Sequence, residues 1–451
     1  MSTGGASGKA NLIRFVLPSS LGVFCFLTPV TYGGEVTILI GVLTSLANEL
    51  LAESRIPLLL FIVSFSAFLT TLVSLQIFSV LSVKPVWRDL IDVSWPWVTL
   101  RVLGATCAWM IYLKEGPEWI WHDSTGQIAL NDLAGGIMTL FIFAAFLLPL
   151  LTDFGFMEFV GASVQGVFRR VFNLPGRSAV DAMASWLTAA AVGITITSQQ
   201  YQRGFYTARE SAVIATNFSI TSLPFCLFIT EFIGLGHAFF QVYATVLVLG
   251  LIAAIITPRL PPLSRIPDEF FPGTELRPED KTKNSRGETA SGALQSALER
   301  TAQAPGLMSV MREATKNVLD IWFGLLPAVV LLGTLGMAIV EYTPIMQWFS
   351  WPFFWLLELL RVPEAHLAAP TMVVGFFEMF LPAAVGASIE SELTRFVVCC
   401  VGLTQLIYMS EVGVLILKTP LALNFLNLGQ IFLLRTLIVL PLSAAIAHLL
   451  Y

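Results

Sequence analysis

The sequence predicts an all-α, polytopic membrane protein with about ten to twelve transmembrane helices. Hydrophobic residues make up 56% of the 451 residues and charged residues only 12%, whereas soluble domains carry about 25% charged residues. Apolar stretches such as 56–81 and 428–450 reach or exceed the roughly 20 helical residues that cross a bilayer. They show no apolar–polar alternation of period two, which excludes an outer-membrane β-barrel.

Each predicted membrane segment is an apolar run bounded by polar or charged residues. The predicted segments are 12–30, 35–52, 56–81, 97–113, 130–151, 178–198, 208–232, 237–257, 317–341, 366–389, 394–418 and 427–450. Two further stretches, 154–172 and 344–360, are rich in aromatic residues but shorter or more mixed. Such a composition is typical of a helix at the membrane interface or of a short re-entrant element.

Composition and motifs argue against several classes of function. The net charge of −5 provides no basic surface for nucleic acid. The five cysteines lie mostly inside apolar runs, where they are typical of small packing residues, and we expect no metal or cofactor. The sequence has no G-x-x-x-x-G-K-[ST] phosphate loop and no H-E-x-x-H or G-x-S-x-G hydrolase signature. We therefore expect that the chain is not an enzyme.

The sequence divides into four predicted regions. Residues 1–129 hold the N-terminal membrane helices, 130–257 a first repeat, 258–316 a polar loop and 317–451 a second repeat. The loop opens with a proline-rich stretch and is predicted to contain a short amphipathic helix near 289–303. Its lysines and arginines favour a cytoplasmic location.

The two repeats share the same order of elements: a long helix, an amphipathic helix and then three helices. Local anchors agree, because Pro175 precedes Arg209 by 34 residues and Pro363 precedes Arg395 by 32 residues. Such an internal duplication is common in secondary transporters. Whether the repeats are inverted or parallel depends on whether the amphipathic element crosses the membrane, and the loop charges leave both arrangements open.

The second repeat places ionisable side chains within predicted membrane segments, where each costs several kcal/mol unless it is paired or solvated. Thr404, Tyr408 and Glu411 fall at i, i+4 and i+7 and are predicted to share a helix face. Glu378 lies four residues before Pro382, which frees a carbonyl beside this carboxylate. The two carboxylates are therefore candidates for coupling to Na⁺ or H⁺, although a structural role remains an alternative.

Arg435 lies well inside the segment 427–450. Its guanidinium is predicted either to bind an anionic group of a solute or to neutralise Glu411 or Glu378.

The first repeat places polar residues instead of charged ones in the middle of an apolar run. Asn217, Thr221 and Pro224 are predicted to share a helix face, and glutamines precede this run. The candidate substrate-binding residues are Gln199, Gln200, Asn217, Ser219, Thr221, Ser222, Thr404, Gln405, Tyr408, Ser410 and Arg435, and the candidate ion-coupling residues are Glu378 and Glu411.

Four stretches in the two repeats resemble the nucleoside-recognition, or gate, domain family: 168–181, 200–210, 404–413 and 432–436. The likeness covers most of the chain and is greatest to the YjiH-like branch of bacterial inner-membrane proteins. It implies two gate-type halves with helical hairpins and broken helices around a central solute site. It does not specify a nucleoside as the substrate.

These observations together predict a multi-pass protein of the cytoplasmic (inner) membrane. Its expected function is a secondary transporter or permease for a small polar metabolite, nucleoside-like or amino-acid-like, with H⁺ or Na⁺ as a coupling ion. The alternatives are a non-catalytic gate or scaffold subunit of a membrane complex, and a membrane enzyme acting on lipid-linked substrates. The expected partners are a solute, the lipid bilayer, and either further copies of the chain or a second membrane protein.

Overall fold

The computed structural model describes residues 4–32, 35–77, 88, 90–187, 190–219, 221–273 and 290–451. In this part of the chain the regular structure is helical except for one antiparallel pair of strands, β1 (Pro29–Tyr32) and β2 (Glu35–Ile38). The pair separates α1 (Gly4–Leu27) from α2 (Leu39–Leu50), where two adjoining membrane helices were predicted. Its β-branched and aromatic residues favour strands over a helix.

Six helical stretches among the described residues are long and apolar enough to cross a membrane, so the chain is a multi-pass membrane protein. They are Arg55–Ser74, Ile128–Thr152, Gly236–Arg259, Leu307–Tyr342, Glu392–Lys418 and Phe425–Leu450. The predicted number of ten to twelve membrane helices comes from the apolar runs in the sequence. Several of these runs form short or interrupted helices in the structure.

The chain folds into two compact units that each combine distant stretches of sequence. Unit 1 comprises Met1–Thr28, Leu147–Pro305 and Phe353–Tyr451, and unit 2 comprises Pro29–Phe146 and Gly306–Pro352. These boundaries differ from those of the four predicted regions, because spatial packing joins segments that the sequence order separates. The predicted regions follow the sequence repeat and stay a prediction.

In unit 2, α5 (Trp95–Leu113) packs on both α3 (Arg55–Ser74) and α18 (Leu326–Tyr342). Gly104 allows the close approach of α5 to α18, because a Cβ atom there would lie 2.2 Å from the Pro327 carbonyl oxygen. The other helices that begin in this unit after α2 are α6 (Glu118–Trp121), η2 (Ile128–Ala134), α7 (Gly135–Leu147), α17 (Leu307–Asp320), η7 (Ile321–Leu325) and α19 (Ile345–Leu359).

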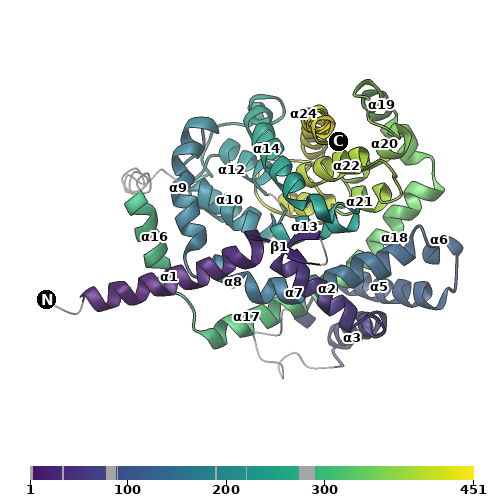
Figure 1. Cartoon of the computed structure of the whole chain (residues 1–451), viewed down its shortest axis with the longest axis horizontal. Helices are drawn as coiled ribbons and strands as arrows, with labels where there is room; N and C mark the ends of the chain where they lie inside the picture. Colours follow the sequence, from purple (N-terminus) through teal and green to yellow (C-terminus); the bar gives the residue numbers. More distant parts are fainter. Residues whose placement is uncertain are drawn as a thin grey trace. The chain divides into compact units, whose positions relative to one another are not determined.

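Unit 1 holds the broken helices of both repeats. From the first repeat come α8 (Pro149–Thr152), α9 (Phe156–Val171), α10 (Ser178–Leu187), α11 (Ala190–Gln202), α12 (Ala208–Asn217), α13 (Leu223–Phe232), η3 (Gly236–Ala238) and α14 (Phe239–Ile256). From the second repeat come α20 (Ala365–Val374), α21 (Leu381–Gly386), α22 (Glu392–Thr404), η8 (Met409–Gly413), α23 (Val414–Lys418) and α24 (Phe425–Leu450). Figure 1 shows α22 and α24 beside α14, and these three helices pack on one another.

The interruptions in α12/α13 and α20/α21 each precede a proline. Pro224 and Pro382 occupy the first turns of α13 and α21, respectively. A proline is tolerated there because the backbone N–H that it lacks has no partner inside the helix. The chain is non-helical from Gly375 to Phe380, so the segment predicted at 366–389 is interrupted just before Pro382.

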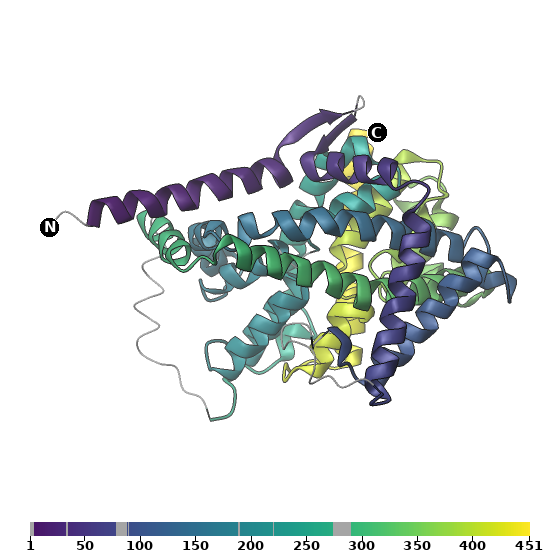
Figure 2. The same cartoon turned by 90° about the horizontal axis from the view of Figure 1, so that it is seen from below.

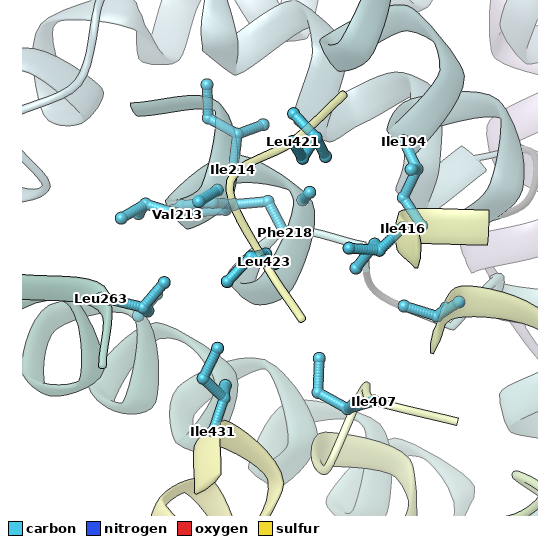
Figure 3. Packing of buried hydrophobic residues seen from close by; sticks show 14 of the residues in the cluster. Ile194, Val213, Ile214, Phe218, Leu263, Ile407, Ile416, Leu421, Leu423 and Ile431 are labelled. Carbon is cyan, nitrogen blue, oxygen red and sulfur yellow. The ribbon is translucent and has the colours of Figure 1, made fainter. Parts of the chain in front are cut away.

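One hydrophobic cluster of described residues contains side chains from both repeats within unit 1. Figure 3 shows Ile194 of α11 and Phe218 near Ile407, Ile416 and Ile431 of the second repeat. Three phenylalanines of the first repeat pack within this cluster, with ring centroids about 5 Å apart: Phe168, Phe172 and Phe218. Burial of this apolar surface stabilises the shared fold of the two repeats.

The polar loop contributes the predicted amphipathic helix, here α16 (Ala290–Ala302), which packs on α9 and α1. In Figure 2, α16 is the green helix nearest the N-terminal part of the purple α1. Arg300 forms ion pairs with Asp153 at 3.5 Å and Glu158 at 3.4 Å. The loop also contains the short turns η4 (Thr257–Arg259) and η5 (Leu263–Arg265), whereas 274–289 lie outside the described residues.

A buried hydrogen bond ties the first turn of α10 to the segment before α12. The hydroxyl of Tyr206 donates to Oδ2 of Asp181 at 2.5 Å, and both side chains are buried. Replacing Tyr206 by Phe is expected to lower the free energy of unfolding by about 1–3 kcal/mol, because the carboxylate loses its buried donor. Thermal unfolding in detergent measures the change. An equal effect of Tyr112→Phe, at an exposed tyrosine, would contradict it.

Candidate functional site

The non-helical segments of the two repeats meet inside unit 1. We call the described residues of 218–222, 375–380 and 405–408 the helix-break region. The backbone N–H groups of Met409 and Ser410 donate to the carbonyl oxygens of Phe376 and Phe377 at 2.8 and 2.9 Å. Thr221 donates from Oγ1 to Sδ of Met379 at 3.1 Å. Contacts within and between the repeats therefore replace some of the hydrogen bonds that continuous helices would form.

Arg435 of α24 links half-helix ends from the two repeats. Its Nε and Nη2 donate to the carbonyl oxygen of Thr404 at 3.0 and 2.8 Å, and its Nη1 donates to Oδ1 of Asn217 at 2.7 Å. Thr404 and Asn217 are the last residues of α22 and α12. A cation is favourable at a helix C-terminus, where backbone carbonyls carry partial negative charge. The guanidinium, which is fully buried, thus stabilises both breaks.

Asn217 has a second donor that the sequence did not reveal. Thr257 is the first residue of η4, and its Oγ1 donates to Oδ1 of Asn217 at 2.5 Å. The amide nitrogen of Asn217 donates to the Val213 carbonyl oxygen at 3.2 Å and to Oγ1 of Thr216 at 3.1 Å. The side chain is therefore fully engaged within the protein.

Gln405 follows α22 directly, and its amide is fully buried. Its Nε2 donates to the Met372 carbonyl oxygen at 2.8 Å and to Oγ1 of Thr436 at 2.9 Å. Its Oε1 is buried without a hydrogen-bond partner among the described residues. That oxygen faces Gly375, where a Cβ atom would lie only 2.1 Å from it. Glycine at 375 therefore makes room for a buried acceptor.

Replacing Gly375 by Ala is expected to displace the Gln405 amide and to lower the free energy of unfolding by about 1–3 kcal/mol, because two buried hydrogen bonds are disturbed. Thermal unfolding in detergent measures the change. The matched control is Gly429→Ala in α24, where nothing lies within 4 Å of the new Cβ atom. This control is expected to be neutral or stabilising by up to about 1 kcal/mol. Equal stability of the two variants would refute the proposed contact.

Five other predicted polar residues are buried, and three of them bond to carbonyl oxygens nearby in the sequence. Tyr408 donates from its hydroxyl to the Gly402 carbonyl oxygen at 2.8 Å, and Thr404 donates to that of Cys400 at 2.7 Å. Ser219 donates to the Ala215 carbonyl oxygen at 2.7 Å. Thr221 contacts Met379, as above, and Ser222 precedes α13 without a side-chain capping bond. The break after Thr404 means that Thr404, Tyr408 and Glu411 do not share one helix face, contrary to prediction.

The same correction applies to Asn217, Thr221 and Pro224. Asn217 ends α12 and Pro224 lies in the first turn of α13. No single α-helix therefore places these three residues on one face.

Glu378 serves as a cap for a half-helix. Its Oε2 accepts hydrogen bonds from the backbone N–H groups of Phe380 at 2.6 Å and Leu381 at 3.2 Å. A carboxylate at this position satisfies first-turn donors and complements the positive end of α21. Phe380 packs on Phe232 of α13, with ring centroids 4.5 Å apart. The carboxylate is therefore positioned at a contact between the repeats.

Glu411 and Ser410 are exposed, unlike most of the other candidates. The Glu411 carboxylate accepts a hydrogen bond from the backbone of Ala191, in the first turn of α11, and lies within electrostatic reach of Glu378. No ion pair joins Arg435 to either glutamate in the described part of the chain, so the predicted neutralisation of these carboxylates by Arg435 is wrong. The two carboxylates instead lie at the N-terminal ends of half-helices.

The two glutamines of α11 lie apart from this network. Gln199 is exposed, and Gln200 is partly buried with its Oε1 lacking a partner among the described residues. The hydrogen bonds of the described residues do not connect either side chain to Arg435 or Gln405.

Four residues of the site were absent from the sequence prediction: Thr257, Thr436, Met379 and Gly375. Thr257 and Thr436 lie in or beside apolar runs, where a threonine commonly bonds to its own helix. Nothing in a single sequence distinguishes such a threonine from one that also bonds to a distant residue, as Thr257 does by donating to Asn217 and Thr436 by accepting from Gln405. The sequence Gly375-Phe-Phe-Glu offered a weak signal, since an interior glycine often marks a close approach.

Comparisons with known proteins place these features in context. A family model described as Gate, nucleoside recognition, matches residues 134–236. An uncharacterized protein of Alkalihalophilus pseudofirmus is 44% identical over 453 residues, which cover 98% of this chain and 95% of that protein. No solved structure matches the chain.

Proposed function

The chain belongs to the same family as the uncharacterized Alkalihalophilus pseudofirmus protein, and we propose that it is a secondary transporter or permease of the cytoplasmic membrane. The proposed cargo is a small polar metabolite, either nucleoside-like or amino-acid-like. The match to the nucleoside-recognition model supports this proposal because it includes Asn217, Ser219, Thr221 and Ser222.

One observation carries the proposal: half-helix ends from both repeats meet around Arg435, Asn217 and the helix-break region. Non-helical backbone at membrane depth is tolerated only where protein buries it or where it lines an aqueous cavity. Secondary transporters use such discontinuous helices at the interface of two repeats to bind solutes and coupling ions. If these segments served only to pack the two repeats together, continuous apolar helices would do so at a lower free-energy cost.

Arg435 and Gln405 retain hydrogen-bonding capacity for a solute. The guanidinium has five N–H donors. Three of them donate to Asn217 and Thr404. The buried Oε1 of Gln405 has no partner among the described residues. In our proposal, these groups bind polar atoms of the solute when the repeats separate during transport. The remaining candidate residues of both repeats complete the binding surface.

Glu378 and Glu411 are the proposed ion-coupling residues. Both carboxylates lie at half-helix N-termini and within electrostatic reach of each other. A shared proton or a bound Na⁺ would relieve the repulsion between two neighbouring carboxylates. Movement of the half-helices would then change the affinity of the pair for the ion.

The direct test is uptake by purified protein in proteoliposomes. Nucleosides, nucleobases and amino acids are offered with and without imposed Na⁺ and H⁺ gradients. Accumulation of one compound class only in protein-containing vesicles is the expected result. Wild-type protein that neither binds nor moves any of these compounds would refute the proposal.

The alternatives predict different outcomes in the same preparation. A scaffold subunit would co-purify with a second membrane protein and would move solutes only in its presence. A membrane enzyme would convert lipid-linked substrates, and we propose that the chain has no such activity.

A further inference from the structure

Two half-helices from different repeats also touch at the ends that lie away from the helix-break region. α13 begins beside that region and ends at Phe232, whereas α22 begins at Glu392 and ends beside it. Phe232 and Glu392 are therefore the distal ends of the two half-helices. We call the contact between residues 232–238 and 391–395 the end contact.

One hydrogen bond of the end contact does not respond to pH. A Schellman-type turn closes α13, with Gly234 in the left-handed region at a φ of 77°. The neighbouring carbonyl oxygen of Ile233 accepts a hydrogen bond from Nη1 of Arg395 in α22 at 3.0 Å. A Cβ atom on Gly234 would lie 2.4 Å from that nitrogen, so glycine makes room for the contact. An arginine keeps its charge at every physiological pH, so this bond holds throughout.

The other bond of the end contact involves a titratable partner. Nε2 of His237 lies 2.6 Å from Oε1 of Glu392, and the two side chains are 51% and 37% exposed. Both residues lie in the first turn of a candidate membrane span, Gly236–Arg259 or Glu392–Lys418. Water therefore reaches the pair at the ends of two spans.

Protonation strengthens this pair. An imidazole becomes charged as the pH falls through about 6.5, whereas a glutamate stays ionised above about pH 5. A charged imidazole adds Coulomb attraction to its hydrogen bond with the carboxylate. The bond between His237 and Glu392 is therefore stronger at about pH 5.5 than at about pH 7.5.

Other charged and titratable side chains surround the pair. Those on the elements packed around it are Glu231, Glu364, His366, Glu390, Arg395, His448 and Tyr451. Tyr451 lies within electrostatic reach of Glu392. His366 is exposed at the start of α20, and His448 contacts the Leu360 carbonyl oxygen at 2.9 Å. In the described part of the chain, His237 is the histidine that forms an ion pair with a carboxylate.

We propose that the end contact is a pH-sensitive latch between the two repeats, closed more firmly when His237 is protonated. Transport as proposed above requires the repeats to separate, and α13 cannot move away from α22 at this end without breaking both bonds. The latch therefore slows solute movement at low pH. This inference rests on the proposed transport function, because it names what regulates the separation of the repeats.

Hydrogen exchange of the purified full-length protein tests the latch without any solute. Backbone amides of 232–238 are followed at about pH 5.5 and pH 7.5, with each rate corrected for the intrinsic effect of pH on exchange. Wild-type protein is expected to be about two- to fivefold more protected at the lower pH, the range given by partly exposed ion pairs. His237→Gln should lose this difference. His237→Lys, with a permanent charge, should keep the higher protection at both values.

His448→Gln is the matched control, because it removes a histidine of the same unit that faces a carbonyl oxygen instead of a carboxylate. It should retain the pH dependence of the wild type. The same dependence in wild type and His237→Gln would overturn the proposal. Protection of His237→Lys that changes with pH as in the wild type would also overturn it.

Exchange of labelled for unlabelled solute in proteoliposomes, at equal pH on both sides, tests the effect on transport. Wild-type exchange should be about two- to fivefold slower at the lower pH than the exchange of His237→Gln. Exchange with the same pH dependence in both proteins would overturn the latch and leave transport intact. A His237-dependent change in protection without uptake of any solute would refute transport and support the pH response of the end contact.

Discussion

Replacing Arg435 by Met is expected to lower the free energy of unfolding by about 1–3 kcal/mol and to abolish solute uptake, because buried neutral acceptors lose a charged donor. Methionine fills much of the same volume but donates no hydrogen bond. The Thr404 carbonyl and the Asn217 amide oxygen lose three bonds of 2.7 to 3.0 Å to the guanidinium. The Asn217 oxygen keeps the Thr257 hydroxyl as a donor, so the main loss is at the Thr404 carbonyl, where a buried acceptor without its donor costs about 1–3 kcal/mol.

Thermal unfolding in detergent and proteoliposome uptake measure this effect together. The matched control is Gln430→Met, a polar residue on the same helix that is exposed and whose replacement should change stability by no more than about 0.5 kcal/mol. Arg435→Lys keeps the charge but lacks the planar fork of donors, so its stability should lie between those of the wild type and Arg435→Met. Wild-type stability of Arg435→Met would show that Arg435 does not hold the half-helices together.

Replacing Glu378 or Glu411 by Gln is expected to abolish gradient-driven accumulation while leaving the fold intact. Glutamine keeps a side-chain oxygen that can accept from the Phe380 and Leu381 N–H groups. It cannot take up a proton at physiological pH and binds a cation less strongly than a carboxylate. Accumulation against a gradient should fall by at least about tenfold, which corresponds to about 1.4 kcal/mol of lost ion binding.

Uptake with and without imposed ion gradients distinguishes coupling from solute binding. Both Gln variants should still exchange labelled for unlabelled solute, because that exchange requires no net ion movement. Glu390→Gln removes an exposed carboxylate between α21 and α22 and should behave as the wild type. Glu378→Ala, which also loses the cap of α21, should be less stable than Glu378→Gln by about 0.5–2 kcal/mol. Normal gradient-driven accumulation by both Gln variants would remove these residues from ion coupling.

Several features of the fold followed from local sequence. The amphipathic helix predicted near 289–303 is α16 (Ala290–Ala302), and the aromatic-rich stretch 154–172 contains α9 (Phe156–Val171). Periodicity and composition over 10 to 20 residues suffice for such elements, because an amphipathic helix needs only one apolar face. The polar interruption around Asn217 was also visible in the sequence. Which groups Asn217 would contact was not.

The sequence by itself determined that the chain is a multi-pass membrane protein, and it identified the polar residues that interrupt the apolar runs. Hydropathy is a local property, so a run of about 20 apolar residues carries this information without its neighbours. The tertiary structure alone decided how those polar groups are satisfied. Arg435 and Asn217 are 218 residues apart in sequence, and their contact depends on how α12, α22 and α24 pack. A proline such as Pro382 is compatible with either a kink or the first turn of a new helix, and only the packed structure selects the second.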